Sequence, residues 1–155
     1  MRGARFLLVV LIAAGTGQIA LAVSEPLKIA IQCRQKSIKN GDFFSVATMI
    51  ENASKEVQII HIMTCSYDDH WITGSPFAHV QGSSCESNFL KDVALKSGEV
   101  FKRNLYIRVS DPAEEHSTRS LSFRLGFRNG NEGGNRGLVL APPVWSNPIT
   151  VQIAE

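Results

Sequence analysis

The chain lacks an excess of charge of either sign. Its 155 residues include 16 Lys and Arg against 14 Asp and Glu. Arg2 and Arg5 lie in an N-terminal stretch that has the features of a removable leader, and without them the balance is 14 against 14. Binding to nucleic acid or to an anionic membrane surface depends on excess Lys and Arg. The composition therefore argues against both, and we expect no nucleic-acid partner.

The sequence also lacks the short motifs of common enzyme classes. It contains no Gly-x-Ser-x-Gly, no His-Glu-x-x-His, no phosphate-binding loop and no Gly-x-Gly-x-x-Gly. Each of these motifs places a nucleophile, a metal or a phosphate cradle in a defined local geometry. We therefore expect a protein that is not an enzyme and that carries no cofactor.

Long apolar runs are confined to the N-terminus. Two arginines precede the uninterrupted apolar run Phe6–Ala14, and Ala20–Ala22 supplies a small-x-small cleavage pattern. This is the pattern of a secretory signal peptide. An uncleaved anchor is the alternative, but the run is shorter than the roughly 20 residues that span a bilayer. We predict a signal peptide over residues 1–22, then one exported domain over residues 23–155, periplasmic or extracellular and without a membrane span after cleavage.

From Val23 onward, apolar and polar residues alternate in short runs separated by turn residues. Alternation places one set of side chains on each face of a strand. The spacing indicates an all-β, antiparallel two-sheet sandwich of about seven strands. We interpret the sixth run, residues 118–128, as one unbroken strand in which Gly126 faces solvent. The third run, residues 56–65, is apolar on both faces, as expected of a central strand. The predicted strands cover residues 27–33, 42–52, 56–65, 92–95, 100–110, 118–128 and 149–154.

Three cysteines leave one unpaired in an exported protein. Cys65 and Cys85 lie at the two ends of a long strand-to-strand loop, residues 66–84, which a disulfide would close. Cys33 shares the inward parity of Ile29 and Ile31, which favours a buried free thiol. Loop position favours Cys65–Cys85, while pairing of Cys33 with either of the others stays open.

The same loop contains residue types that bind metals. Cys65, His70, His79 and Cys85 form Cys-x4-His-x8-His-x5-Cys, a candidate tetrahedral zinc or copper site. The spacing has no tight ligand pair, and two nearby cysteines in an oxidising compartment more often form a disulfide. Metal binding through these four residues is therefore an alternative function, and no metal is assigned.

Four consecutive residues of the loop, Asp68, Asp69, His70 and Trp71, are the candidate binding residues. Trp71 is either an exposed anchor for a partner or a cap over one end of the sandwich, and the cap is favoured because large aromatic residues are mostly buried. A hydrolase centred on His70 and Asp69 is the least favoured alternative. Asn52 begins an Asn-Ala-Ser sequon, which is a glycosylation acceptor only in a host that glycosylates.

Three segments resemble immunoglobulin-like domains of secreted bacterial proteins, including proteinase-inhibitor-type and adhesion-type modules. The segments are GDFFSVATMIENASKEVQIIHI, LKSGEVFKRNLYIRV and SLSFRLGFR, and the elements TCSYDDHW, SSC and WSNPIT are similar to uncharacterised exported bacterial proteins. The resemblance implies an immunoglobulin-like sandwich that acts as a protein-binding or structural module. No cysteine lies on the strand of Phe123 and Phe127, so the bridge between sheets seen in antibodies is not implied. Loops at one end of such a sandwich commonly bind partners, which points to residues 66–84 and to the Gly-rich residues 129–137.

Overall fold

The computed structural model describes residues 25–83, 85–110, 120–132 and 138–154. The predicted leader and its cleavage point lie outside these ranges. No helix within them is long and apolar enough to cross a membrane.

The described chain is all-β, with one short 3-10 helix, η1 (Tyr67–His70). Four predicted strands are confirmed almost residue for residue, namely those over 27–33, 42–52, 100–110 and 149–154. The alternation within them is confirmed too, since Phe44, Val46 and Ile50 are all buried. The strands are β1 (Leu27–Cys33), β2 (Ser37–Lys39), β3 (Phe43–Asn52), β4 (Gln58–Met63), β5 (Trp71–Thr73), β6 (Ala78–Val80), β7 (Leu90–Leu95), β8 (Val100–Val109), β9 (Ser120–Phe123), β10 (Leu125–Phe127), β11 (Gly130–Glu132), β12 (Leu138–Leu140), β13 (Val144–Trp145) and β14 (Ile149–Ala154).

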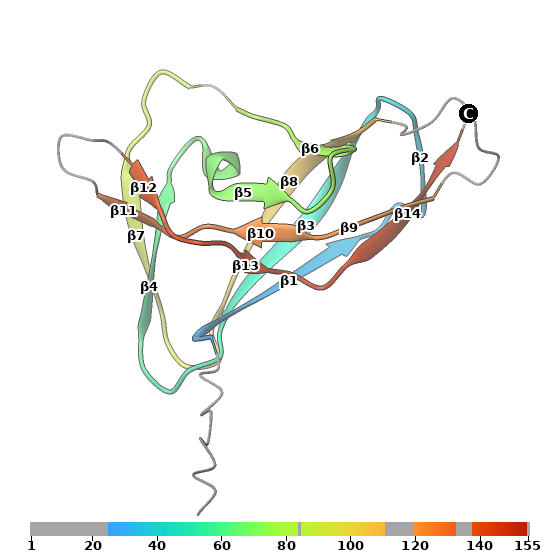
Figure 1. Cartoon of the computed structure of the whole chain (residues 1–155). Coiled ribbons are helices and arrows are strands. Elements are labelled where there is room, and N and C mark those ends of the chain that lie inside the picture. Colours follow the sequence, from blue (N-terminus) through green and yellow to red (C-terminus); the bar gives the residue numbers. More distant parts are fainter. Residues whose placement is uncertain (1–24, 84, 111–119, 133–137, 155) are drawn as a thin grey trace, which may run out of the picture.

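These strands form several small sheets. The largest has the order β1-β3-β8-β6, and the others have the orders β13-β10-β5, β2-β14-β9, β4-β7 and β11-β12. Every pairing is antiparallel except that of β14 with β2. In Figure 1, the chain through β9, β10 and β13 crosses in front of β3 and β8, and β14 lies to the right of them. The two groups pack through side chains, as shown by Phe44 of β3 and Phe123 of β9, whose ring centroids lie 6.2 Å apart, edge to face.

The strand predicted over residues 118–128 is broken at Arg124. Before the break β9 pairs with β14, and after it β10 pairs with β13 and β5. The prediction that Gly126 faces solvent is wrong, because β13 covers it. A Cβ at this position would lie 2.9 Å from Pro143 Cβ and 3.0 Å from Trp145 Cε3. The outer side of Trp145 is covered in turn by the guanidinium of Arg124, 4.5 Å from its ring centroid.

The prediction of a central strand over residues 56–65 is also wrong. Within the described residues β4 pairs only with β7, and Ile59 is 49% exposed. The other edge of β4 is satisfied by side chains instead of a strand. Asn129 accepts a bond from His61 N (2.8 Å) and donates one to Ile59 O (3.2 Å). Met63 N donates to His70 Nε2 (2.9 Å).

Substituting Gly126→Ala should lower the free energy of unfolding by about 1–3 kcal/mol, because the new methyl group overpacks against Pro143 and Trp145. Urea unfolding followed by circular dichroism measures this change. Gly82→Ala is the matched control, since its Cβ would meet only Asp68 Oδ2 at an ordinary 3.6 Å. Equal stability of the two variants would contradict the packing described for Gly126.

Candidate functional site

The prediction of one long loop over residues 66–84 is wrong for its described part, residues 66–83. They contain η1, β5 and β6. β5 pairs with β10 through Trp71 and Phe127, and β6 extends the largest sheet through Ala78 and Val109. The segment therefore contributes strands to two sheets. The Gly-rich residues 129–137 likewise include β11, and residues 133–137 lie outside the described ranges.

Two of the four candidate binding residues are wrongly assigned, because they lie in the core. His70 is 0% exposed and Trp71 is 4% exposed. Trp71 packs against the rings of Tyr67 and Phe127, with centroid distances of 5.7 and 5.3 Å. Side chains that are this buried cannot contact a partner while the domain is folded. The favoured interpretation of Trp71, as a residue that packs inside, agrees with this burial.

Asp68 and Asp69 lie nearer the surface, at the start of η1. Asp68 accepts hydrogen bonds from Ser83 N (2.9 Å) and from Ser83 Oγ, which ties η1 to the end of the same segment. Asp69 is exposed. The four residues therefore do not form one surface: the two carboxylates are outside and the two rings inside.

His70 is a structural link between β4 and β10. Met63 N can only donate, so Nε2 of His70 is the unprotonated acceptor, and Nδ1 carries the hydrogen that Arg128 O accepts (2.9 Å). Burial lowers the pKa of His70. The ring is therefore neutral, and both of its nitrogens are occupied by backbone groups. It has no nitrogen left for a metal or for proton exchange with a substrate.

The structure joins Cys65 and Cys85 in a disulfide with their Cα atoms 6.2 Å apart, and leaves Cys33 free. Cys33 is only half-buried, and its thiol donates to Gln35 O (3.2 Å). His79 lies exposed on β6 opposite Arg108. The predicted metal ligands thus do not converge: two are in the disulfide, one is enclosed and one is on a different strand. No group of three or more His, Cys, Asp or Glu side chains in the described part of the chain is arranged to hold a metal.

Asn52 of the sequon is fully buried. Its amide nitrogen donates to Glu56 O (2.7 Å) and Leu95 O (2.8 Å), and its oxygen accepts from Ser54 N (2.9 Å). The side chain closes the turn after β3. The folded domain therefore has no room for a glycan on this nitrogen.

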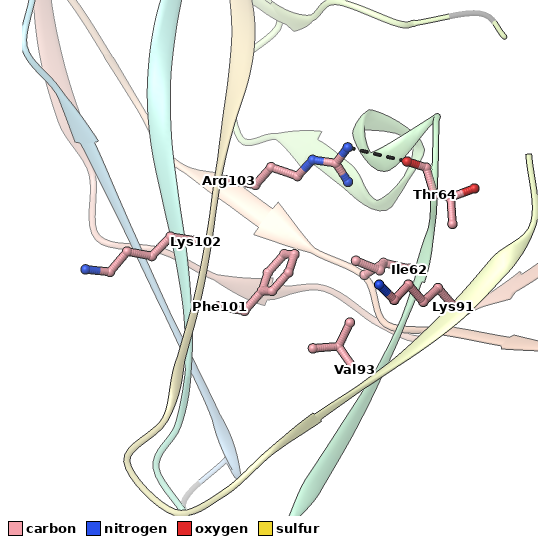
Figure 2. Close-up of a pocket in the computed structure, with 7 residues that line it drawn as sticks. All are labelled: Ile62, Thr64, Lys91, Val93, Phe101, Lys102 and Arg103. Atoms are coloured by element: carbon pink, nitrogen blue, oxygen red, sulfur yellow. Dashed lines mark hydrogen bonds between the residues drawn. The ribbon is translucent and has the colours of Figure 1, made fainter.

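An open hollow of about 370 Å³ lies between β8 and the β4–β7 pair (Figure 2). Its floor is apolar and consists of Ile62, Val93 and Phe101, which point toward one another across the gap. Lys91 extends from β7 toward β8, whereas Lys102 points away from the gap. The hollow thus joins an apolar floor to cationic side chains.

Arg103 marks the upper end of this hollow. Its Nη2 donates to Thr64 O (3.4 Å), and its guanidinium lies 5.0 Å from the centroid of the Tyr67 ring. Burial raises the pKa of Tyr67 to about 12, so the ring under the guanidinium is uncharged. Arg103 also lines a second hollow of about 210 Å³, which continues past Asn104 and Tyr106 to the disulfide-closed segment at Cys65, Asp68 and Ser83.

The edge of β8 beside both hollows has no strand partner within the described residues. β3 pairs with one edge of β8 along its length, but on the other edge β6 pairs only with Ile107–Val109. On that second edge Gln81 N donates to Tyr106 O (2.8 Å) and Ser110 N donates to Phe77 O (2.9 Å), so even-numbered residues face it. The backbone groups of Val100, Lys102 and Asn104 therefore point outward along an open edge. We call this edge with its two hollows the β8 groove.

Sequence reasoning missed the β8 groove, although one residue carried a signal for it. Arg103 shares the inward parity of Phe101 and Leu105 within a strand whose alternation is otherwise regular. A charged residue at an inward position indicates that nothing covers the strand there. The sequence could not show the rest, because the floor and Lys91 come from other strands.

Replacing both Cys65 and Cys85 by Ser should lower the free energy of unfolding by about 3 kcal/mol, because the disulfide closes a loop with a sequence separation of 20. Cys33→Ser is the matched control and should change stability little, since its thiol makes one exposed hydrogen bond. Denaturant unfolding with and without reductant measures both. A double variant as stable as the oxidised wild type would contradict a stabilising Cys65–Cys85 disulfide.

The stability of the domain should fall as the pH drops below about 6.5, in part through His70. Its pKa is lowered in the folded state, so between the folded and unfolded pKa values the unfolded chain binds a proton that the folded one does not. The contribution is complete above the unfolded value and is lost as the pH falls toward the folded one. Unfolding of wild type and His70→Gln over pH 4–8 tests this. The variant should show a shallower pH dependence, and parallel curves would contradict the role of His70.

No family model matches the chain, and no curated protein matches it. One solved structure that resembles it is that of AvmM, described as catalysing macrocyclization in alchivemycin A biosynthesis. That match has a TM-score of 0.39 and 10% sequence identity, and it covers 85% of this chain and 90% of the AvmM chain. So weak a likeness carries no argument about function.

Proposed function

We propose that this chain is an exported, non-enzymatic, immunoglobulin-like module that binds another protein. Support for the immunoglobulin-like part comes from the all-β fold, with its largest sheet packed across β9 through Phe44 and Phe123. Support for export comes from the disulfide, since such bonds persist in oxidising compartments. The binding site moves from the loop residues that the sequence favoured to the β8 groove.

One observation carries the binding proposal: β8 has an open edge beside an apolar floor. Unpaired N–H and C=O groups in a row form a template for another strand, and natural proteins usually cover or block them. Peptide-binding domains use such edges to add a strand from a partner. Hollows beside the edge, such as that over Ile62, Val93 and Phe101, supply the pockets that give such binding its specificity.

The interior supports a non-enzymatic role. His70, the residue at the centre of the alternative hydrolase, is enclosed and bonded at both nitrogens. Asp69, the other residue of that alternative, is exposed, and the preceding residue, Asp68, is bonded to Ser83. These side chains hold the segment together, and their geometry leaves no nucleophile paired with a free base.

Photo-crosslinking tests the proposal. Benzoylphenylalanine in place of Tyr106, which is 61% exposed and lines the second hollow, should capture one discrete partner when the protein is exported by its own cells. Benzoylphenylalanine in place of Gln152, exposed on β14, is the control and should not capture it. Lys102→Pro should abolish the product, because Pro removes an edge N–H without breaking a bond to β3. The same products at both positions, or none at Tyr106, would refute a binding site at the β8 groove.

A further inference from the structure

We infer that the occupant of the β8 groove is an extended, acidic segment of a partner protein, with carboxylates and apolar side chains in alternation, which adds to the edge of β8 as a strand. This inference rests on the proposed function and specifies the partner. Three features of the β8 groove support it: its open backbone, the two different sides of that edge, and its charge.

The open backbone selects an extended chain. Residues 100–105 of β8 have a strand partner on one side only within the described residues. At about 3.3 Å per residue, this edge is roughly 20 Å long, enough for a short strand. A helix or a folded loop would leave its N–H and C=O groups unpaired, whereas an added strand satisfies them.

The two sides of the edge differ, which favours a partner segment with alternating apolar and acidic residues. Successive side chains of an added strand would point to opposite faces. One set would lie over the floor of Ile62, Val93 and Phe101. The other set would lie beside the exposed outer face of β8, where Lys102 and Asn104 are its cross-strand neighbours. Apolar residues fit the part of the first set that lies over the floor. Acidic residues fit the second set, beside Lys102, and the end of the first set that meets Arg103.

The positive charge of the groove favours a partner segment that is negatively charged. The lining of the first hollow includes Lys91 and Arg103 on the floor side and Lys102, whose side chain points to the outer face of β8, and it includes no carboxylate. The nearest acidic side chain of the second hollow, Asp68, is already bonded to Ser83. Arg103 donates one weak bond, to Thr64 O at 3.4 Å, and a guanidinium has several N–H donors. The remaining donors can bind a carboxylate, the group that a guanidinium fits best.

The same charges argue against a second copy of this chain as the occupant. Pairing β8 with β8 of another copy would bring Lys102 and Arg103 of both chains into one short ladder. Like charges placed opposite each other in a ladder are destabilising. The partner is therefore a chain of opposite charge.

Fluorescence anisotropy with labelled synthetic peptides tests the inference on the mature protein. The probe is a peptide of about seven residues with alternating Glu and Val, the length that the open edge accommodates. A peptide with Lys in place of Glu should bind at least about tenfold more weakly. N-methylation of one alternate set of residues should abolish binding, while N-methylation of the other set, whose N–H groups face away from β8, should be tolerated.

Charge reversal in the protein supplies the matched variants. Lys91→Glu with Lys102→Glu should weaken binding of the Glu-Val peptide by at least about tenfold, and added salt should weaken it in the wild type. Lys28→Glu with Lys55→Glu changes net charge equally at exposed sites outside the groove and should leave binding near the wild-type value.

Some outcomes would overturn this inference while leaving the proposed function intact. Equal binding of the Lys peptide, indifference to which alternate set is methylated, or a crosslink from position 106 to a second copy would each do so. Tight binding of the acidic peptide without any cellular crosslink from position 106 would instead support the chemistry of the groove and count against the proposed function.

Discussion

The hydrogen bonds that Asn129 and His70 make with the edge of β4 are the constraint on which the site depends. They satisfy His61 N, Ile59 O and Met63 N without a neighbouring strand. They also hold β4 beside β11 and the residues that follow β10. In Figure 1 the β4–β7 pair stands apart from the largest sheet. The turn between β7 and β8 is tight, with Glu99 N bonded to Lys96 O, yet the two strands diverge and do not pair as a hairpin (Figure 1). The groove exists because of that divergence.

Alternation in the sequence predicted strands well and sheets poorly. A period of two places Phe44, Val46 and Ile50 on one face whatever the partner, and that face is buried. Alternation does not determine which strands pair. The sequence pattern therefore gives no sign that the chain passes from one sheet to another at Arg124, between β9 and β10. For β4, an apolar run on both faces indicated a central position. The structure satisfies the second edge with side chains and leaves Ile59 exposed.

The site was misplaced for a related reason. Residues 66–84 contain the residue types with the most reactive side chains, and that concentration attracted the prediction of binding and metal sites. Residue type does not report burial or hydrogen-bonding: His70 is occupied by Met63 and Arg128, and Trp71 is in the core. The pairing of Cys65 with Cys85 could be predicted from the sequence because it depends on the positions of the two cysteines at the ends of a loop. The β8 groove depends on residues from three strands brought together only by folding.

An open edge exposes a protein to association with its own copies, and the residues around β8 bear on that hazard. Lys on an edge strand is a common defence against pairing between copies. Here Lys102 lies on the open edge beside Arg103, so two such edges repel each other, while an acidic strand meets both charges favourably. A neutral edge would pair with many chains, and a covered edge with none. The cations of β8 can thus serve solubility and selection together, since the charge that excludes a second copy is the charge that recognises an acidic partner.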